Sequence, residues 1–260
     1  MKILVCLKQV SAKESTLRLS EDSLHVRESD LSFEINEPDT FALEEALRLK
    51  EQLGGEVVVV SLGPARIQTS IREALAKGAD RGIHIETENA ESVDRTWAAG
   101  LIAAAVREEK FDLVLTGLQS DDLGTGQTGV ILAEFLGLPH ATIIMEIQIE
   151  ESRIKAKREL EGGWFEWVEM PLPALLTIQS GLNKPRYASL LGIKKAKSKE
   201  MRRVTPVELG AEVSGTNALR LRKIYVPVKS KNTEFLDGTP KEAAAKLVER
   251  IRREIVSSPS

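Results

Sequence analysis

The chain has 260 residues, of which 42% are hydrophobic and 29% are charged, and its formal net charge is -3. A chain of this length and composition forms a hydrophobic core of its own, which excludes a disordered or fibrous protein. The small negative charge and the aromatic content of 4% exclude the basic, base-stacking surface that is typical of nucleic-acid-binding proteins.

The cysteine, histidine and N-terminal patterns limit the chemistry further. Cys6 is the single cysteine, which excludes an intrachain disulfide, and three scattered histidines show no metal-ligand spacing. The first apolar run spans five residues before Lys8, which is typical of a buried strand and not of a signal peptide or membrane span. We expect no metal and no membrane span. We also expect a cytoplasmic location, or the mitochondrial matrix if the chain is eukaryotic and its targeting peptide is missing.

Short apolar runs alternate with longer amphipathic runs up to residue 149. The apolar runs predict buried strands at 2–7, 57–62, 82–85, 113–116 and 141–149. The amphipathic runs predict helices at 38–53, 67–77, 92–109 and 128–136. Asp39 and Ser92 are the expected N-caps of the first and third helices. Because strands and helices alternate, the predicted fold class is α/β, with an open, mostly parallel, doubly wound sheet.

The pattern changes after residue 150. The remaining expected elements are a polar surface hairpin at 17–28, a β-hairpin at 153–159 and 164–170, a strand at 175–178 and a terminal helix at 241–255. Thr239 is the expected cap of that helix, and Pro240 suits its first position. Residues 180–238 show no periodicity, so we expect an arm that packs on a partner rather than a core of its own.

Ligands of open parallel sheets bind outside the carboxyl ends of the strands. The segments expected to meet there are Cys6–Lys8, Asn36–Asp39, Leu62–Pro64 and Leu118–Gly129. The last contains a G-x-G-x-x-G pattern between a strand and a helix, an arrangement whose backbone N–H groups hold phosphate. It does not lie on the first strand, which favours another phosphate-binding loop over a dinucleotide fingerprint, and a glycine turn without a ligand is the alternative. Asp121 and Asp122 would lie close to the phosphate unless they turn toward a ribose or a loop amide.

Other candidate residues have plainer interpretations. Cys6 lies in a buried strand and is expected to be a core residue and not a nucleophile. His84 is expected to be a strand residue with its ring hydrogen-bonded, and Glu44-Glu45 a solvated helix face that pairs with Arg48. The basic run 194–203 is either solvated or contacts an acidic partner. No sequence motif of a catalytic site is found, so no catalytic residues are predicted.

Four motifs give the chain a resemblance to a known family. They are NEPDTFALEEALRLK at 36–50, REALAKGADRGIH at 72–84, QTG at 127–129 and LNKPRYASL at 182–190. In this order, and across essentially the whole chain, they resemble the beta subunit of electron transfer flavoproteins. The resemblance implies an adenine-nucleotide-binding type of fold, with AMP in this chain, or a second FAD as in the electron-bifurcating members. It also implies a heterodimer with an alpha subunit that holds the electron-carrying FAD. Such a heterodimer passes electrons from acyl-CoA and related dehydrogenases to a quinone oxidoreductase or similar acceptor.

Matching positions imply the residues of two sites. The nucleotide contacts fall on Cys6, Asn36, Glu37, Pro38, Asp39, Leu62, Asp122, Leu123, Gly124, Thr125, Gly126, Gln127, Thr128 and Gly129. The partner-docking residues are Tyr187, Leu190, Leu191, Ile193, Lys194, Lys195 and Lys197, with Leu190 as the anchoring leucine. Leu191 stands where the family has proline, and Ser198 and Glu200 interrupt the family's run of lysines. Gln127-Thr128-Gly129 is the AMP-type pattern, whereas Thr125 matches a threonine of the bifurcating type.

Three functions are compatible with these residues. The first is an electron-carrier subunit that binds AMP, and the second is a bifurcating subunit whose own FAD reacts with NADH. The third is a nucleotide-sensing protein without a redox role, which has no use for an arm. The predicted domains are a nucleotide-binding α/β domain with a hairpin at 1–180, and a docking loop, arm and terminal helix at 181–260.

Overall fold

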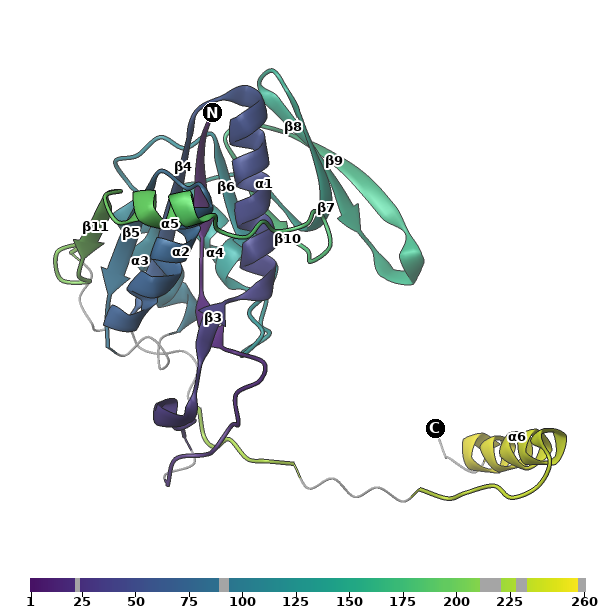
Figure 1. Cartoon of the computed structure of the whole chain (residues 1–260). Coiled ribbons are helices and arrows are strands. Elements are labelled where there is room, and N and C mark those ends of the chain that lie inside the picture. The colour runs from purple at the N-terminus through teal and green to yellow at the C-terminus, as the bar shows by residue number, and fades with distance from the viewer. Residues whose placement is uncertain (22–23, 89–93, 211–220, 228–232, 257–260) are drawn as a thin grey trace. The chain divides into compact units, whose positions relative to one another are not determined.

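A nine-stranded sheet organises the first of two units, Met1–Arg222 and Lys223–Ser260 (Figure 1). The computed structural model describes residues 1–21, 24–88, 94–210, 221–227 and 233–256. The strands, in spatial order, are β11 (Met201–Val204), β5 (Arg81–Glu86), β4 (Glu56–Gly63), β1 (Lys2–Cys6), β6 (Leu113–Gly117), β10 (Ala174–Ile178), β7 (His140–Glu150), β8 (Arg153–Glu159) and β9 (Phe165–Pro171). Strands from β11 to β7 are parallel and β7, β8 and β9 are antiparallel, so the predicted open, mostly parallel sheet is confirmed.

Helices cover both faces of this sheet. They are α1 (Glu37–Leu53), α2 (Gln68–Lys77) and α5 (Leu190–Ala196) on one face, and α3 (Arg95–Ala105) and α4 (Thr128–Leu136) on the other. Along β1, Ile3 and Val5 pack with α1 and α2, whereas Leu4 and Cys6 pack with α3 and α4. A strand buried on both faces reads as an unbroken apolar run, which is why the sequence identified it. Within the described ranges, no helix is both long and apolar enough to cross a bilayer.

Two predicted helix starts are wrong. Asn36 is the N-cap of α1, and Asp39 lies inside its first turn, where the side chain bonds to other segments. Helix α3 begins at Arg95 behind Asp94, whose carboxylate accepts from Thr96 N at 3.1 Å, and ends at Ala105. The proposed cap Ser92 lies outside the described residues.

Strand β10 has a place that the sequence pattern does not reveal. Its five residues are all buried, and it lies between β6 and β7 although it follows both of them in the chain. The β8–β9 hairpin that precedes it is confirmed and extends the sheet beyond β7 (Figure 1). The polar hairpin near the N-terminus is reduced to one bridge between Leu19 and Val26 in the described part, and residues 22–23 lie outside it. The smaller elements are a second sheet of β2 (Gln9–Ser11) and β3 (Phe33–Ile35), and the 3-10 helices Glu28–Asp30, Ala65–Ile67 and Glu161–Gly163.

The prediction that residues from 180 onward form an arm on a partner is wrong for the first of them, because α5 and β11 pack on the sheet and helices of this chain. Helix α5 lies against α2, and a Cβ at Gly192 would be 2.2 Å from Ala76 O, so only glycine permits this approach. Strand β11 pairs with β5. The boundary between the two units follows Arg222, later than the predicted division at residue 180, because a seven-residue helix and a four-residue strand leave no visible periodicity.

The second unit contains α6 (Pro240–Val256), which confirms the predicted terminal helix. Thr239 and Glu242 cap it reciprocally, since Thr239 N donates to Glu242 Oε2 at 2.8 Å and Glu242 N donates to Thr239 Oγ1 at 3.4 Å.

Candidate functional site

The strand order reverses between β1 and β6. From β1 the chain continues through β4 and β5 on one side, and then crosses to β6 on the other side of β1. A crevice outside the carboxyl ends of two such strands is the usual ligand site of an open α/β sheet. The first turn of α1 and the loop 118–127 contact each other at this edge, as the sequence predicted.

Asp39 ties the ends of the two central strands together. Its Oδ2 accepts from Lys8 N at 2.7 Å, after β1, and its Oδ1 accepts from Gly117 N at 3.0 Å, at the end of β6. The residue is 6% exposed, and burial raises the pKa of its carboxyl to about 7 although both hydrogen bonds act in the opposite direction. A Cβ at Gly117 would be 2.3 Å from Asp39 Oδ1, so this contact requires glycine.

Asn36 holds the loop that follows β6. Its Nδ2 donates to Gln119 O at 3.0 Å, and its Oδ1 accepts from Asp121 N at 2.9 Å. Asn36 is 1% exposed, and its side chain makes no capping bond to α1 because both of its polar atoms are used on the loop. The buried amide therefore fixes the loop against the start of α1.

Lys8 holds the same loop from the other side. Its ammonium lies 2.7 Å from both carboxylate oxygens of Asp122 and 3.3 Å from Ser120 Oγ. Burial acts to raise the pKa of Asp122, but the charge and hydrogen bond of Lys8 outweigh it and keep the pKa below its ordinary value. The Asp121 carboxylate accepts from Glu37 N at 3.4 Å. Both loop acids thus have partners within the chain.

The glycines of the loop have two distinct roles. Gly124 and Gly126 have φ of 59° and 62°, a conformation that favours glycine. Gly129 has ordinary backbone angles but presses α4 onto the sheet, where a Cβ would be 2.6 Å from Thr116 Oγ1 and 2.7 Å from Thr177 Cγ2. Gln127 is the N-cap of α4 and makes no side-chain capping bond.

The remaining predicted nucleotide contacts differ in exposure. Cys6 is buried at the end of β1, where burial, and secondarily the charge of Asp39, raises the pKa of its thiol. The core interpretation of Cys6 is confirmed. Pro38 is buried, and Leu62 is half-buried at the end of β4. The others are exposed at the start of α1 and on the loop, namely Glu37, Leu123, Thr125 and Gln127, or half-buried at the start of α4, namely Thr128.

The predicted docking residues lie on a separate surface. We define the docking segment as Tyr187–Lys197. Tyr187, Leu190 and Leu191 are 94%, 88% and 61% exposed. Ile193, Lys194 and Lys195 are exposed on α5 as well, and Lys197 is exposed directly after its end. Ser189 caps this helix, since its Oγ accepts from Gly192 N at 3.0 Å.

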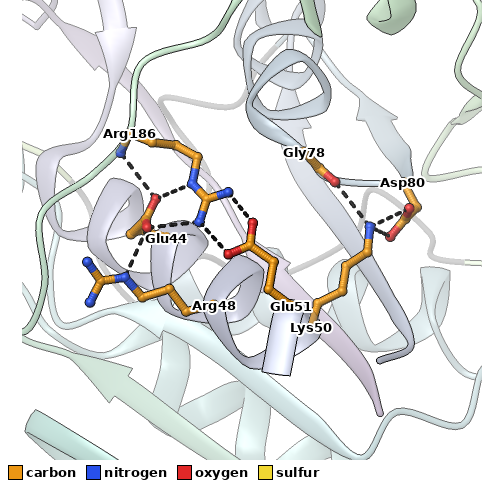
Figure 2. A network of polar contacts seen from close by, with 7 residues as sticks. All are labelled: Glu44, Arg48, Lys50, Glu51, Gly78, Asp80 and Arg186. Carbon is orange, nitrogen blue, oxygen red and sulfur yellow. Dashed lines mark hydrogen bonds and ion pairs between the residues drawn. The ribbon is translucent and has the colours of Figure 1, made fainter. Parts of the chain in front are cut away.

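The structure corrects the predictions for Glu44 and His84. Glu44 is 4% exposed and binds Arg186 as well as Arg48, so it is not on a solvated face (Figure 2). His84 is buried, and its Nε2 lies 2.9 Å from Gly63 O, but Nδ1 has no hydrogen-bond partner among the residues that the structure describes, so the predicted hydrogen-bonded ring is confirmed for one nitrogen only.

Sequence reasoning missed the roles of Lys8 and Arg186. Lys8 directly follows the end of a predicted strand, and this position could have identified it as a residue of the site. Arg186 lies 142 positions beyond Glu44, and no local pattern links them. In the described part of the chain, no group of three or more histidine, cysteine, aspartate or glutamate side chains is arranged to hold a metal ion.

A doubly wound sheet with loops converging at a switch point defines a ligand-binding type of α/β protein. The electron transfer flavoprotein domain matches residues 23–209. The chain is 40% identical over 259 residues to the electron transfer flavoprotein subunit beta of Methylophilus methylotrophus, which covers 96% of this chain and 98% of the relative. Identity to the subunit beta of Homo sapiens is 38% over 251 residues, covering 93% and 97%, and to that of Bradyrhizobium diazoefficiens 37% over 257 residues, covering 98% of each. The chain belongs to the electron transfer flavoprotein beta subunit family, a family of electron transport.

Proposed function

We propose that this chain is the beta subunit of a heterodimeric electron transfer flavoprotein and binds AMP at the switch-point edge. In this proposal an alpha subunit holds the electron-carrying FAD. The heterodimer takes electrons from acyl-CoA-type dehydrogenases and passes them to a quinone oxidoreductase or a similar acceptor. The observation that supports the nucleotide assignment is the glycine loop 124–129, which leads into α4 between the ends of β6 and β10.

The residues at this edge fit a phosphate-bearing ligand. The start of α4 has no side-chain cap, and N–H groups at a helix start favour an anion. Asp122 is neutralised by Lys8, Asp39 bonds to two backbone N–H groups and Asp121 accepts from Glu37 N, so each of these three carboxylates has a partner within the chain. In this assignment the backbone of Gly126–Gly129 holds the phosphate, and Asn36 holds the loop.

The docking segment supports the electron-transfer part of the proposal. Three large side chains, Tyr187, Leu190 and Leu191, are exposed on a helix start that is otherwise packed on α2. Interface energy concentrates in a few such anchors, while neighbouring cations act mainly on the rate of association. We assign Leu190 as the anchor for an acyl-CoA-type dehydrogenase and the lysines 194, 195 and 197 as steering charges.

One measurement tests the nucleotide and the redox role together. The chain is co-expressed with its alpha subunit, the flavin content of the heterodimer is taken from its visible spectrum, and the nucleotides are released by denaturation and separated by chromatography. We expect one FAD and one AMP per heterodimer. Two FAD and no AMP would assign the switch-point edge to a second flavin, as in electron bifurcation. A heterodimer without any flavin would favour a nucleotide-sensing protein.

A further inference from the structure

Arg186 lies immediately before the exposed part of the docking segment and binds two carboxylates of α1 (Figure 2). Glu44 Oε2 accepts from the backbone N and from Nε of Arg186 at 3.1 and 2.8 Å, and Glu44 Oε1 accepts from Nη2 at 3.1 Å. Glu51 binds the outer side of the same guanidinium, with Nη2 donating to Oε2 at 3.1 Å. Arg48 Nε donates to the same Glu44 Oε1 at 3.0 Å. We call these four residues the Arg186 cluster.

Because Glu44 is buried, the loss of its arginine partner is unfavourable. The Glu44 side chain is 5% exposed, whereas that of Arg186 is 31% exposed. Burial acts to raise the pKa of Glu44, but Arg186 and Arg48 outweigh it and hold the pKa below its ordinary value. Removing one partner from a buried charge is strongly unfavourable, unlike breaking a surface ion pair. Conformations in which Arg186 leaves Glu44 are therefore disfavoured.

Neighbouring contacts hold the chain on both sides of the exposed residues. Before them, Asn183 Nδ2 donates to Phe41 O and to Glu45 Oε2, both at 3.0 Å. After them, Arg72 of α2 donates to Ala196 O and Lys199 O at 2.7 and 2.8 Å. The exposed side chains thus stand on a backbone that is held by α1 on one side and by α2 on the other.

We propose that Arg186 is a positioning residue for partner docking: its bonds to Glu44 and Glu51 keep Tyr187 and Leu190 in a binding-ready arrangement without touching the partner. This inference rests on the docking role proposed above. A segment that is ordered before binding loses less conformational entropy when the partner binds, so a loosened segment binds more weakly with the same side chains.

The test uses the heterodimer with its alpha subunit as electron acceptor for a purified acyl-CoA dehydrogenase. Arg186→Gln should raise the KM for the flavoprotein about 3- to 10-fold and leave kcat and flavin content unchanged. Arg186→Lys, which keeps the charge but loses the planar fork, should give a smaller rise. Glu51→Gln should also raise KM, by a smaller factor, and should not disturb folding because the Glu51 side chain is 58% exposed.

Arg48→Gln is the matched control, because it removes an arginine from the same carboxylate without releasing the docking segment. It should leave KM unchanged. Leu190→Ala separates the two proposals. If Leu190→Ala raises KM but Arg186→Gln and Glu51→Gln do not, the positioning role is wrong and the docking role stands. If Leu190→Ala has no effect, the docking role and the positioning role fail together. A loss of flavin content and kcat in Arg186→Gln at constant KM would show a purely structural arginine and would overturn the proposal.

Discussion

The switch-point edge and the docking segment use α1 in different ways. At the switch-point edge, Asn36 and Asp39 direct their polar atoms to backbone groups and so fix the loop that follows β6. At the docking segment, Glu44 and Glu51 hold Arg186, and the neighbouring side chains form the surface. A single helix therefore fixes the backbone of a loop at one surface and an arginine side chain at the other. The switch-point edge should respond to changes in backbone space, and the docking segment to changes in side chains.

The largest effect is expected at Gly129. Gly129→Ala places a Cβ 2.6 Å from Thr116 Oγ1, so α4 must shift away from the sheet. Overpacking of this kind costs about 1–3 kcal/mol of unfolding free energy and should remove most of the bound nucleotide. Chemical unfolding and released-nucleotide chromatography measure both effects. Gly100→Ala is the matched control on α3, where the new Cβ makes an ordinary 3.8 Å contact with Phe135 and should be neutral or stabilising. Equal behaviour of the two variants would refute this packing argument.

The next effect is expected at Asn36. Asn36→Ala leaves Gln119 O and Asp121 N without their buried partner, which costs about 1–3 kcal/mol. Amide hydrogen exchange should accelerate in the loop 118–122 and remain unchanged in the docking segment. Faster exchange in both regions would contradict the separation of the two surfaces.

Asp39 should make the stability of the chain depend on pH. Its pKa is about 7 when folded against an ordinary value of 3.8, so between these pH values the folded chain binds more protons than the unfolded chain. Stability contributed by this group is therefore present at low pH and is lost as pH rises through about 4 to 7. The unfolding free energy is measured for wild type and Asp39→Asn across this pH range. It should fall with rising pH in wild type and change less with pH in the variant. Parallel pH profiles would show that Asp39 does not titrate there.

The smallest effect is expected at the steering lysines. Charge reversal of Lys194 and Lys195 should slow association with a dehydrogenase a few-fold at low salt, because complementary charges raise the association rate. The effect should shrink with added salt, since exposed charges are screened over about 10 Å at 0.1 M salt. The salt dependence of the association rate should flatten, and nucleotide content should stay constant. Lys110→Glu, at another exposed position, is the control. A salt dependence that the reversal does not change would exclude steering by these lysines.

The sequence predicted the elements that bury whole faces and missed those defined by distant partners. The strands β1, β4, β5, β6 and β7 were predicted from their apolar runs, whereas the three-residue strands β2 and β3 were not. Of the four segments expected at the switch-point edge, three contact one another, through Lys8, Asn36 and the loop 118–127, and the place of Leu62–Pro64 in the site stays a prediction. Asp39 was mistaken for a cap because its acceptor role depends on Gly117, which is 78 positions away. Helix α5 and strand β11 were missed because each is too short to show a period.

The position of β10 has a consequence for synthesis of the chain on the ribosome. Strands β6 and β7 emerge first, yet their common neighbour, Ala174–Ile178, emerges only after the β8–β9 hairpin. Until then the nascent polypeptide exposes two apolar strand edges that must wait for the same strand, and such edges favour aggregation. A truncated product ending before Ala174 keeps both edges open. Chaperone binding to ribosome-bound chains should therefore decline once β10 has left the exit tunnel.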